Sequence, residues 1–263
     1  MNILDTIIAQ KKAELAVRRP GRPVAELEKL PLFSAPTLSL KAFLNDPART
    51  GIIAEFKRRS PSRGVINDTA TVAEVTAAYA SHGASAISVL TDEEFFGGKL
   101  ADLQTATINQ VPLLRKDFMI DEYQVTEAKA MGADVILLIA ACLTPARVKE
   151  LAVFARKLHL EVLLEIHTEE ELQHICDETE IVGVNNRDLK TFKVDINRSI
   201  ELSKEIPSNK IKIAESGIND VETICIFRQA GFKGFLIGEN FMKQPDPTIA
   251  FARFVQQLKK LES

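Results

Sequence analysis

The sequence predicts an α/β fold, a (β/α)8 TIM barrel with an N-terminal helical extension. Eight short apolar runs of β type follow one another between residues 52 and 237, and a helical pattern follows each run. An open parallel sheet usually has about five or six strands, so eight strand and helix units favour a closed barrel. The length of 263 residues fits one such barrel. We therefore expect a single domain over residues 1–263, of which residues 1–48 are the extension.

The extension begins with an amphipathic helix over residues 3–17. One face of this helix carries Ile3, Leu4, Ile7, Ile8 and Leu15. The prolines and glycine of residues 19–23 end it, and Pro31 and Pro36 keep the following segment irregular. A short helical turn at residues 40–44 leads to the barrel. We expect the extension to pack against something else, which the sequence does not identify, through its apolar face.

From residue 50 the strands and helices alternate. Glycines such as Gly83, Gly132 and Gly231 precede strands and fit the ends of the preceding helices. The predicted strands are residues 52–57, 86–90, 111–115, 135–139, 162–165, 181–184, 211–214 and 234–237. The predicted helices are residues 72–81, 100–108, 123–131, 145–158, 169–176, 196–205, 221–229 and 247–260.

Composition excludes several classes of protein. Hydrophobic residues make up 46% and charged residues 26% of the chain, which is ordinary for a globular protein and argues against disorder. The formal net charge of −3 argues against nucleic acid as a partner. Neither a signal peptide nor an apolar run long enough to span a membrane is present in the sequence. We expect a cytoplasmic protein with no nucleic-acid or membrane partner.

The cysteines and histidines predict no metal site. Cys142, Cys176 and Cys225 are far apart in the sequence, and the four histidines add no ligand spacing. The thiols are most simply buried and reduced, with a reactive role as the less favoured alternative.

Polar residues close several of the predicted strands. In a barrel of this kind the active site lies at the carboxyl ends of the strands. Any one such charge is as easily explained by a solvated strand end, but together they favour a catalytic site. The residues are Glu55 and Lys57 on the first strand, Lys116 after the third, Glu165 on the fifth, Asn185 and Arg187 after the sixth, and Glu215 and Ser216 after the seventh.

Two glycines follow the last two strands and indicate where a phosphate binds. Ser216 and Gly217 follow the seventh strand, and Gly238 and Glu239 follow the eighth. Glycines there let backbone N–H groups approach an anion, at the usual phosphate position of these barrels. One such glycine is often only a turn, but two predict a phosphorylated small-molecule substrate. No GxGxxG pattern is present, so no nucleotide site is expected.

Two loops are candidates for covering the site. Residues 58–64 concentrate arginines with proline and glycine, and their place at the barrel mouth favours a lid over an anionic substrate. The alternatives are a solvated run of charge or a nucleic-acid patch. Phe95 and Phe96, after the second strand, could cover a ring or simply pack beneath their loop.

At these motifs the sequence resembles the indole-3-glycerol phosphate synthase family over essentially the whole chain. The resemblance includes the N-terminal extension. The matching stretches include Ala-Glu-Phe-Lys-Arg-Arg-Ser-Pro-Ser at residues 54–62, Leu-Arg-Lys-Asp-Phe at 114–118, Val-Asn-Asn-Arg at 184–187 and Ala-Glu-Ser-Gly-Ile at 214–218.

The resemblance implies a decarboxylating and dehydrating ring closure in L-tryptophan biosynthesis, without a cofactor. The substrate would be 1-(2-carboxyphenylamino)-1-deoxyribulose 5-phosphate and the products indole-3-glycerol phosphate, carbon dioxide and water. Lys116 would protonate the ketone oxygen as the aromatic carbon attacks. Lys57 would pair with a substrate anion and serve as an acid for the later loss of water.

The resemblance also implies roles for the remaining residues. Glu55 and Glu165 would take protons and stabilise the positively charged ring nitrogen, with Asn185 and Glu215 orienting them. The residues implied in substrate binding are Ser60, Phe118 and Arg187, with Ser216, Gly217, Gly238 and Glu239 at the phosphate. Some members of the family carry a serine at the position of Glu239. The difference costs little phosphate binding if only the backbone N–H of this residue is used.

Two other functions remain open from the sequence. One is another phosphate-binding barrel enzyme, such as an aldolase that uses Lys116 as a Schiff-base nucleophile. The other is a barrel that binds a partner without catalysis. The complete set of charged residues at the strand ends argues against this alternative. We expect a monomer or a weak homo-oligomer.

Overall fold

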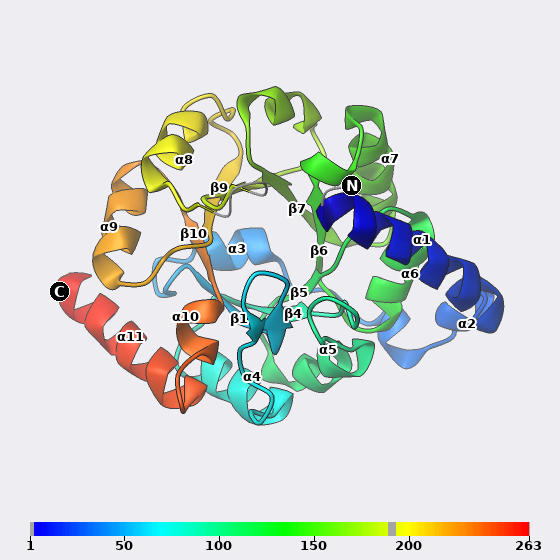
Figure 1. Cartoon of the computed structure of the whole chain (residues 1–263), viewed down its shortest axis with the longest axis horizontal. Helices are drawn as coiled ribbons and strands as arrows, with labels where there is room; N and C mark the ends of the chain where they lie inside the picture. Colours follow the sequence, from blue (N-terminus) through cyan, green and yellow to red (C-terminus); the bar gives the residue numbers. More distant parts are fainter. Residues whose placement is uncertain (1–2, 189–192, 263) are drawn as a thin grey trace.

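The computed structural model describes residues 3–188 and 193–262, and it contains a closed barrel of parallel strands surrounded by helices (Figure 1). The predicted barrel is confirmed. Consecutive barrel strands are hydrogen-bonded neighbours, and the first pairs with the last. The barrel strands are β1 (Ile52–Phe56), β4 (Ala86–Leu90), β5 (Leu113–Lys116), β6 (Val135–Ile139), β7 (Glu161–Ile166), β8 (Ile181–Asn185), β9 (Ile211–Glu215) and β10 (Gly234–Ile237).

Helices connect the strands and form the outer layer. Thr71, Asp121, Thr144, Asp195 and Asp220 precede five of them, and each accepts a backbone N–H of the first turn, which satisfies a donor that the helix leaves open. The outer helices are α4 (Val72–Ser81), α5 (Leu100–Ala106), η2 (Thr107–Asn109), α6 (Glu122–Ala130), η3 (Ala140–Cys142), α7 (Pro145–Lys157), η4 (Glu169–His174), α8 (Ile196–Ser203), α9 (Val221–Gln229), α10 (Glu239–Met242) and α11 (Pro247–Glu262).

The alternation of side chains along each strand divides the core into two layers. Ile53, Leu114, Leu163 and Ile213 belong to the cluster inside the barrel, whereas the residues next to them face the helices. Every second residue of a strand shares a face. The side chains that close these strands two positions later therefore point into the barrel mouth.

The structure corrects three of the predictions. The third barrel strand begins at Leu113 instead of residue 111, because Pro112 has no N–H to donate to a ladder. The helix expected at 169–176 is only the short 3₁₀ helix η4, and the loop after β1 folds back as an unpredicted ribbon of β2 (Arg59–Ser60) and β3 (Gly64–Val65).

The N-terminal segment lies against the barrel. It contains α1 (Ile3–Gly21), α2 (Val24–Leu27), η1 (Pro31–Ser34) and α3 (Leu40–Asn45). The first helix is longer than predicted, since it continues through Pro20 to Gly21, and it lies across the rim of the barrel near β6 in Figure 1. Its predicted apolar face is confirmed, since Ile7 and Leu15 are buried.

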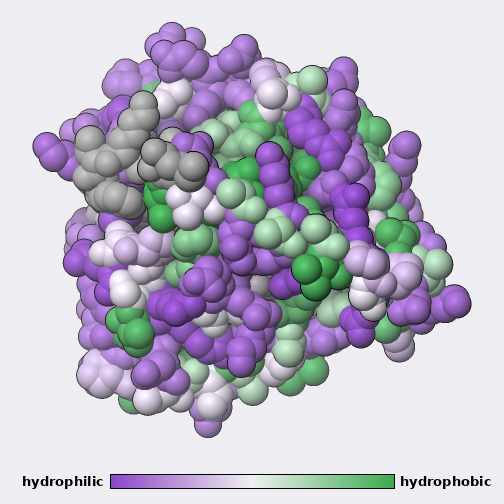
Figure 2. Space-filling model, turned by 45° about the vertical axis from the view of Figure 1, so that its right-hand side comes forward, coloured by the Kyte–Doolittle hydropathy of each residue, from purple (hydrophilic) through white to green (hydrophobic). Residues whose placement is uncertain are grey.

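The surface shows no concentration of apolar side chains on the face in Figure 2, where hydrophobic residues stand in small groups among hydrophilic ones. Exposed large apolar side chains such as Val17, Ile108 and Ile226 belong to separate elements, which is ordinary for a protein surface. In the described part of the chain, no helix is both long enough and apolar enough to cross a bilayer.

Candidate active site

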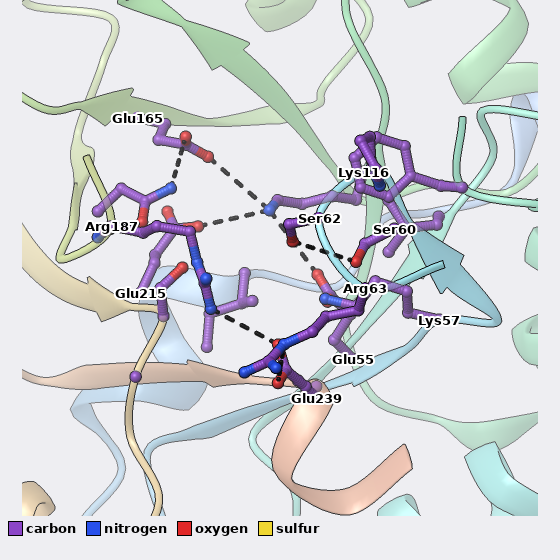
Figure 3. Close-up of a pocket in the computed structure, with 18 of the residues that line it drawn as sticks. Glu55, Lys57, Ser60, Ser62, Arg63, Lys116, Glu165, Arg187, Glu215 and Glu239 are labelled. Carbon is purple, nitrogen blue, oxygen red and sulfur yellow. Dashed lines mark hydrogen bonds and ion pairs between the residues drawn. The ribbon is translucent and has the colours of Figure 1, made fainter. Parts of the chain in front are cut away.

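A cavity of about 550 Å³ lies at the carboxyl ends of the barrel strands (Figure 3). Three residues of α1, namely Ile3, Leu4 and Ile7, complete its wall. All thirteen residues proposed from the sequence line it: Glu55, Lys57, Ser60, Lys116, Phe118, Glu165, Asn185, Arg187, Glu215, Ser216, Gly217, Gly238 and Glu239.

Lys116 is the cation at the centre of the charged cluster. Its Nζ lies 3.7 Å from Glu55, 3.8 Å from Glu165 and 3.5 Å from Glu215. Burial disfavours the ammonium form, but the charges of the three carboxylates, Glu215 first, outweigh it and raise the pKa of Lys116. The amine is therefore protonated at neutral pH, which suits a proton donor and disfavours a Schiff-base nucleophile, since that must be neutral.

Glu55 and Glu165 are held as carboxylates. Burial alone would raise the pKa of Glu55, but Lys57, whose Nζ lies 2.8 Å from Oε1, and Lys116 lower it. The pKa of Glu165 is also lowered, because Lys116, His167 and Asn185 together outweigh the effect of burial. Nδ2 of Asn185 donates to Oε1 of Glu165 at 3.0 Å. Both side chains can accept a proton at neutral pH.

Glu215 has the opposite character. Burial and the negative charge of Glu165 raise its pKa, in spite of Lys116. Its side chain is 1% exposed, and neither carboxyl oxygen has a hydrogen-bond partner among the described residues. The cluster thus combines two ionised carboxylates with one that holds its proton more readily.

Gly183 on β8 makes room for Glu215. A Cβ atom at this position would lie 2.2 Å from Oε1 of Glu215, much closer than any real contact. Sequence reasoning treated Gly183 only as part of a strand, although a glycine inside a strand is a recognised sign of close approach.

We expect Gly183→Ala to reduce kcat/KM by about 10²-fold, because a shift of the Glu215 carboxyl by about 1 Å disturbs the reacting geometry. Steady-state kinetics would measure this loss. Gly21→Ala is the control, since nothing lies within 4 Å of its new Cβ. Equal activity of the two variants would mean that the position of Glu215 is unimportant.

Polar groups gather at the β8, β9 and β10 side of the cavity. Ser216 and Gly217 both have left-handed backbone conformations, with φ of 68° and 71°, and Nδ2 of Asn186 donates to the Ser216 carbonyl at 2.6 Å. A serine in this conformation is strained, and the hydrogen bond from buried Asn186 holds it. Asn186 was not among the proposed residues.

Arginines face the same side. Nε of Arg63 lies 3.1 Å from Glu239, and Nη2 of Arg187 lies 3.5 Å from it. The other two arginines of the β1 loop are engaged elsewhere, because Arg58 pairs with Asp102 and Arg59 donates to the carbonyls of residues 93 and 94. Of the expected arginine cluster, only Arg63 lines the cavity.

The opposite side of the cavity is apolar. Phe96 and Phe118 line it with their ring centroids 6.1 Å apart, next to Ile7 of α1. Phe95 packs on the inner core cluster and does not line the cavity. The cavity therefore has an apolar end and a polar end, and the charged cluster around Lys116 lies between them.

His167 was missed as a site residue because a single histidine gives no spacing signal. Its Nε2 lies 3.0 Å from Glu165, and its Nδ1 lies 3.3 Å from Glu171. Burial opposes its charge, but hydrogen bonds and charges from Glu165 and Glu171 raise the pKa of His167 to about 9. The imidazolium is thus an ion-pair partner of Glu165, although His167 does not line the cavity.

The raised pKa of His167 predicts that the protein loses stability at high pH. Because the unfolded pKa is about 6.5, the stabilisation is complete below that pH and disappears as pH rises through 9. The wild type should lose about 2.5 kcal/mol more unfolding free energy than His167→Gln between pH 7 and 10. Urea unfolding at the two pH values tests this, with the exposed His82→Gln as control. Parallel losses in all three proteins would contradict the prediction.

Metal ligands do not cluster in the described ranges, residues 3–188 and 193–262, where no group of three or more His, Cys, Asp or Glu could hold an ion. The three cysteines are partly buried and form no disulfide. Burial raises the pKa of the Cys142 thiol to about 12, which makes it a poor nucleophile.

Comparisons with known proteins agree with this geometry. The structure of the tryptophan synthase complex from Pyrococcus furiosus matches with a TM-score of 0.61 at 16% identity, over 81% of this chain and 99% of that chain, which shows the barrel fold alone. A family model described as indole-3-glycerol phosphate synthase matches residues 4–254.

Relatives bearing the same name are similar along their whole length. The indole-3-glycerol phosphate synthase of Bacteroides thetaiotaomicron is 45% identical over 98% of this chain and 99% of its own, and that of Salinibacter ruber is 41% identical over 99% and 98%. The chain, with its barrel and its charged strand ends, belongs to the indole-3-glycerol phosphate synthase family.

Proposed function

We propose that this chain converts 1-(2-carboxyphenylamino)-1-deoxyribulose 5-phosphate to indole-3-glycerol phosphate in L-tryptophan biosynthesis. The reaction joins an aromatic carbon to the ketone carbon of the sugar chain, releases the ring carboxylate as carbon dioxide and removes the ketone oxygen as water. The ketone and the aryl nitrogen supply the electronic activation, so an acid, a base and fixed charges are sufficient.

The observation that carries the proposal is the position of Lys116. Its ammonium lies within 4 Å of carboxylates from β1, β7 and β9, between an apolar and a polar end of one cavity. A proton donor there can reach a ketone whose aryl substituent lies on one side and whose phosphate lies on the other.

The proposal keeps the roles that the family resemblance implies. Lys116 donates a proton to the ketone oxygen as the ring closes, and Lys57 pairs with a substrate anion and donates in the later loss of water. Glu55 and Glu165 accept protons and stabilise the cationic ring nitrogen, while Asn185 and Glu215 orient them. The hydrogen bond from Asn185 to Glu165 supports the orienting role of Asn185.

The two ends of the cavity divide the substrate between them. The aryl ring lies against Phe118 and its neighbours at the apolar end. The phosphate lies at the polar end, where Arg187 and backbone groups are available. The residues proposed at that end are Ser60, Arg187, Ser216, Gly217, Gly238 and Glu239.

The direct test is incubation of the purified protein with the carboxyphenylamino-deoxyribulose phosphate while indole fluorescence is followed. We expect the signal to rise together with release of carbon dioxide. A folded protein that gives no signal would refute the assignment.

A Schiff-base aldolase on the same barrel is the second candidate. It requires a neutral lysine, whereas the ionised carboxylates of Glu55 and Glu165 beside it keep Lys116 protonated. Borohydride added during turnover should give no reducible adduct on the protein, and a stable adduct at Lys116 would favour the aldolase.

We also propose that residues 1–263 form one domain that works in the cytoplasm as a monomer or a weak homo-oligomer. The burial of α1 side chains against the barrel supports a single folding unit, because residues 1–48 then have no core of their own.

A further inference from the structure

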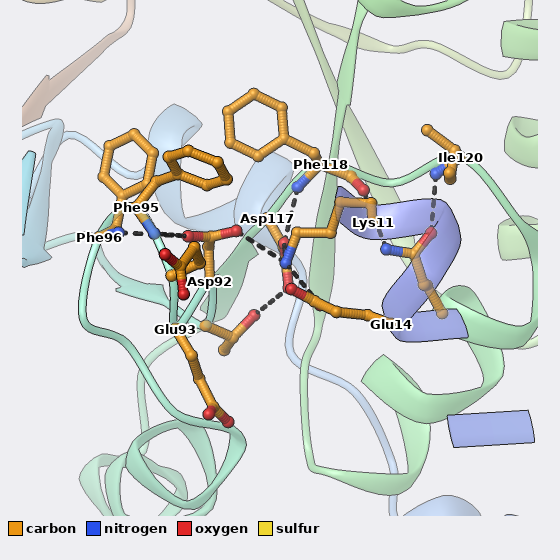
Figure 4. A network of polar contacts seen from close by, with 12 residues as sticks. Lys11, Glu14, Asp92, Glu93, Phe95, Phe96, Asp117, Phe118 and Ile120 are labelled. Atoms are coloured by element: carbon orange, nitrogen blue, oxygen red, sulfur yellow. Dashed lines mark hydrogen bonds and ion pairs between the residues drawn. The ribbon is translucent and has the colours of Figure 1, made fainter. Parts of the chain in front are cut away.

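Helix α1 carries a buried lysine beside the residues that line the cavity. Lys11 follows Ile7 by one helical turn, and its side chain is only 1% exposed. Its Nζ lies 2.8 Å from Asp92 and 3.0 Å from both Asp117 and Glu14 (Figure 4). Asp92 follows the end of β4, and Asp117 follows Lys116 at the end of β5. One ammonium thus joins α1 to two strand ends.

The two aspartates hold the aromatic wall of the cavity. Oδ1 of Asp92 accepts the backbone N–H groups of Phe95 and Phe96 at 2.7 and 3.2 Å. Oδ1 of Asp117 accepts the N–H of Phe118 at 2.8 Å. The rings of Phe96 and Phe118 form the apolar end of the cavity together with Ile7.

The charge balance makes this contact specific. Burial disfavours the charged form of Lys11, but the charges of Asp117 and Asp92 outweigh burial and raise the pKa of Lys11. In turn, Lys11 and Arg115 lower the pKa of Asp117, although burial would raise it. A methionine would bury the same helix face at lower cost, because a buried ion pair often stabilises less than apolar packing. The lysine therefore favours one position of α1 over others.

We propose that Lys11 is a positioning residue for the reaction, which fixes α1 and the two aromatic loops so that Ile7, Phe96 and Phe118 form the wall that receives the substrate's aryl ring. The proposal rests on the proposed function for the identity of the ring. Lys11 acts only through these neighbours, since it does not line the cavity itself.

The test compares the aryl end with the phosphate end in Lys11→Met. We expect at least a tenfold rise in KM for the full substrate with kcat within threefold of the wild type. The dissociation constant of anthranilate, a probe of the aryl end, should rise by a similar factor. The inhibition constant of inorganic phosphate, a probe of the polar end, should stay the same.

Two further variants separate positioning from folding. Lys129→Met removes another buried lysine, whose Nζ donates to the carbonyl of Ala35. Neither residue lines the cavity, so this variant should change stability but not anthranilate binding. Lys11→Met combined with Asp92→Asn relieves an unpaired carboxylate and keeps an acceptor for the loop N–H groups, so it preserves the fold if the single variant unfolds.

The possible results distinguish this inference from the proposed function. A wild type without turnover refutes the function, whereas anthranilate titration still tests the wall directly. The inference is overturned if the wild type does not bind anthranilate, if a folded Lys11 variant binds it as the wild type does, or if phosphate binding weakens equally. It is also overturned if both Lys11 variants unfold while Lys129→Met folds, because Lys11 then serves the fold as a whole.

Discussion

Lys116→Gln should lower kcat by about 10³-fold, because it removes the proton donor for ring closure and the cation that faces three carboxylates. Glutamine keeps most of the volume but cannot donate a charged proton. Steady-state turnover by indole fluorescence gives the magnitude. Rapid quenching and product separation show which step stops, and we expect unreacted substrate to accumulate.

A comparison with Lys57→Gln distinguishes the roles of the two lysines. If Lys57 acts in the later loss of water, its variant should accumulate the ring-closed intermediate. Lys212→Gln is a control for loss of a barrel-strand lysine, because its amine donates to the carbonyl of Ser203 outside the cavity. The assigned roles would be reversed if Lys57→Gln blocked closure while Lys116→Gln blocked only dehydration.

The barrel could be predicted from the sequence because its strands are local signals. Each strand is buried on both faces and reads as a continuous apolar run, so eight such runs indicate the strand number. An apolar run does not define where a strand begins, since Pro112 lies within such a run but has no N–H to donate to the neighbouring strand. The ribbon of β2 and β3 has only two residues in each strand, half-buried in β2 and exposed in β3, and no apolar pattern predicts it.

The charged strand ends could be predicted for a similar reason. The period of two along a strand places Glu55 and Lys57 on the same face, and the fold places all strand ends together. The contacts of Lys11 with Asp92 and Asp117 join residues about 80 and 106 positions apart, and no local pattern encodes such a pair. His167 was missed because its role depends on Glu165 and Glu171 converging on one ring.

Glu165→Gln should also lower kcat by about 10³-fold, with a smaller change in KM. The carboxylate has the best-defined surroundings in the cluster, with Asn185 at 3.0 Å, His167 at 3.0 Å and Lys116 at 3.8 Å. Glutamine can keep the hydrogen bond from Asn185 but can neither accept a proton nor balance a cationic ring nitrogen. The substrate contacts at the two ends of the cavity remain, so binding is largely preserved.

Glu161→Gln is the matched control for Glu165→Gln, because Glu161 lies on the same strand, β7, at its opposite end. Its carboxylate accepts the Ser39 hydroxyl and the backbone N–H of Lys41, which ties the N-terminal segment to the barrel. We expect Glu161→Gln to lower the unfolding free energy by about 1 kcal/mol and to leave kcat unchanged. If Glu165→Gln instead lost stability while keeping wild-type kcat, its carboxylate would be a structural group and the acceptor would have to be Glu55, the other ionised carboxylate of the cluster.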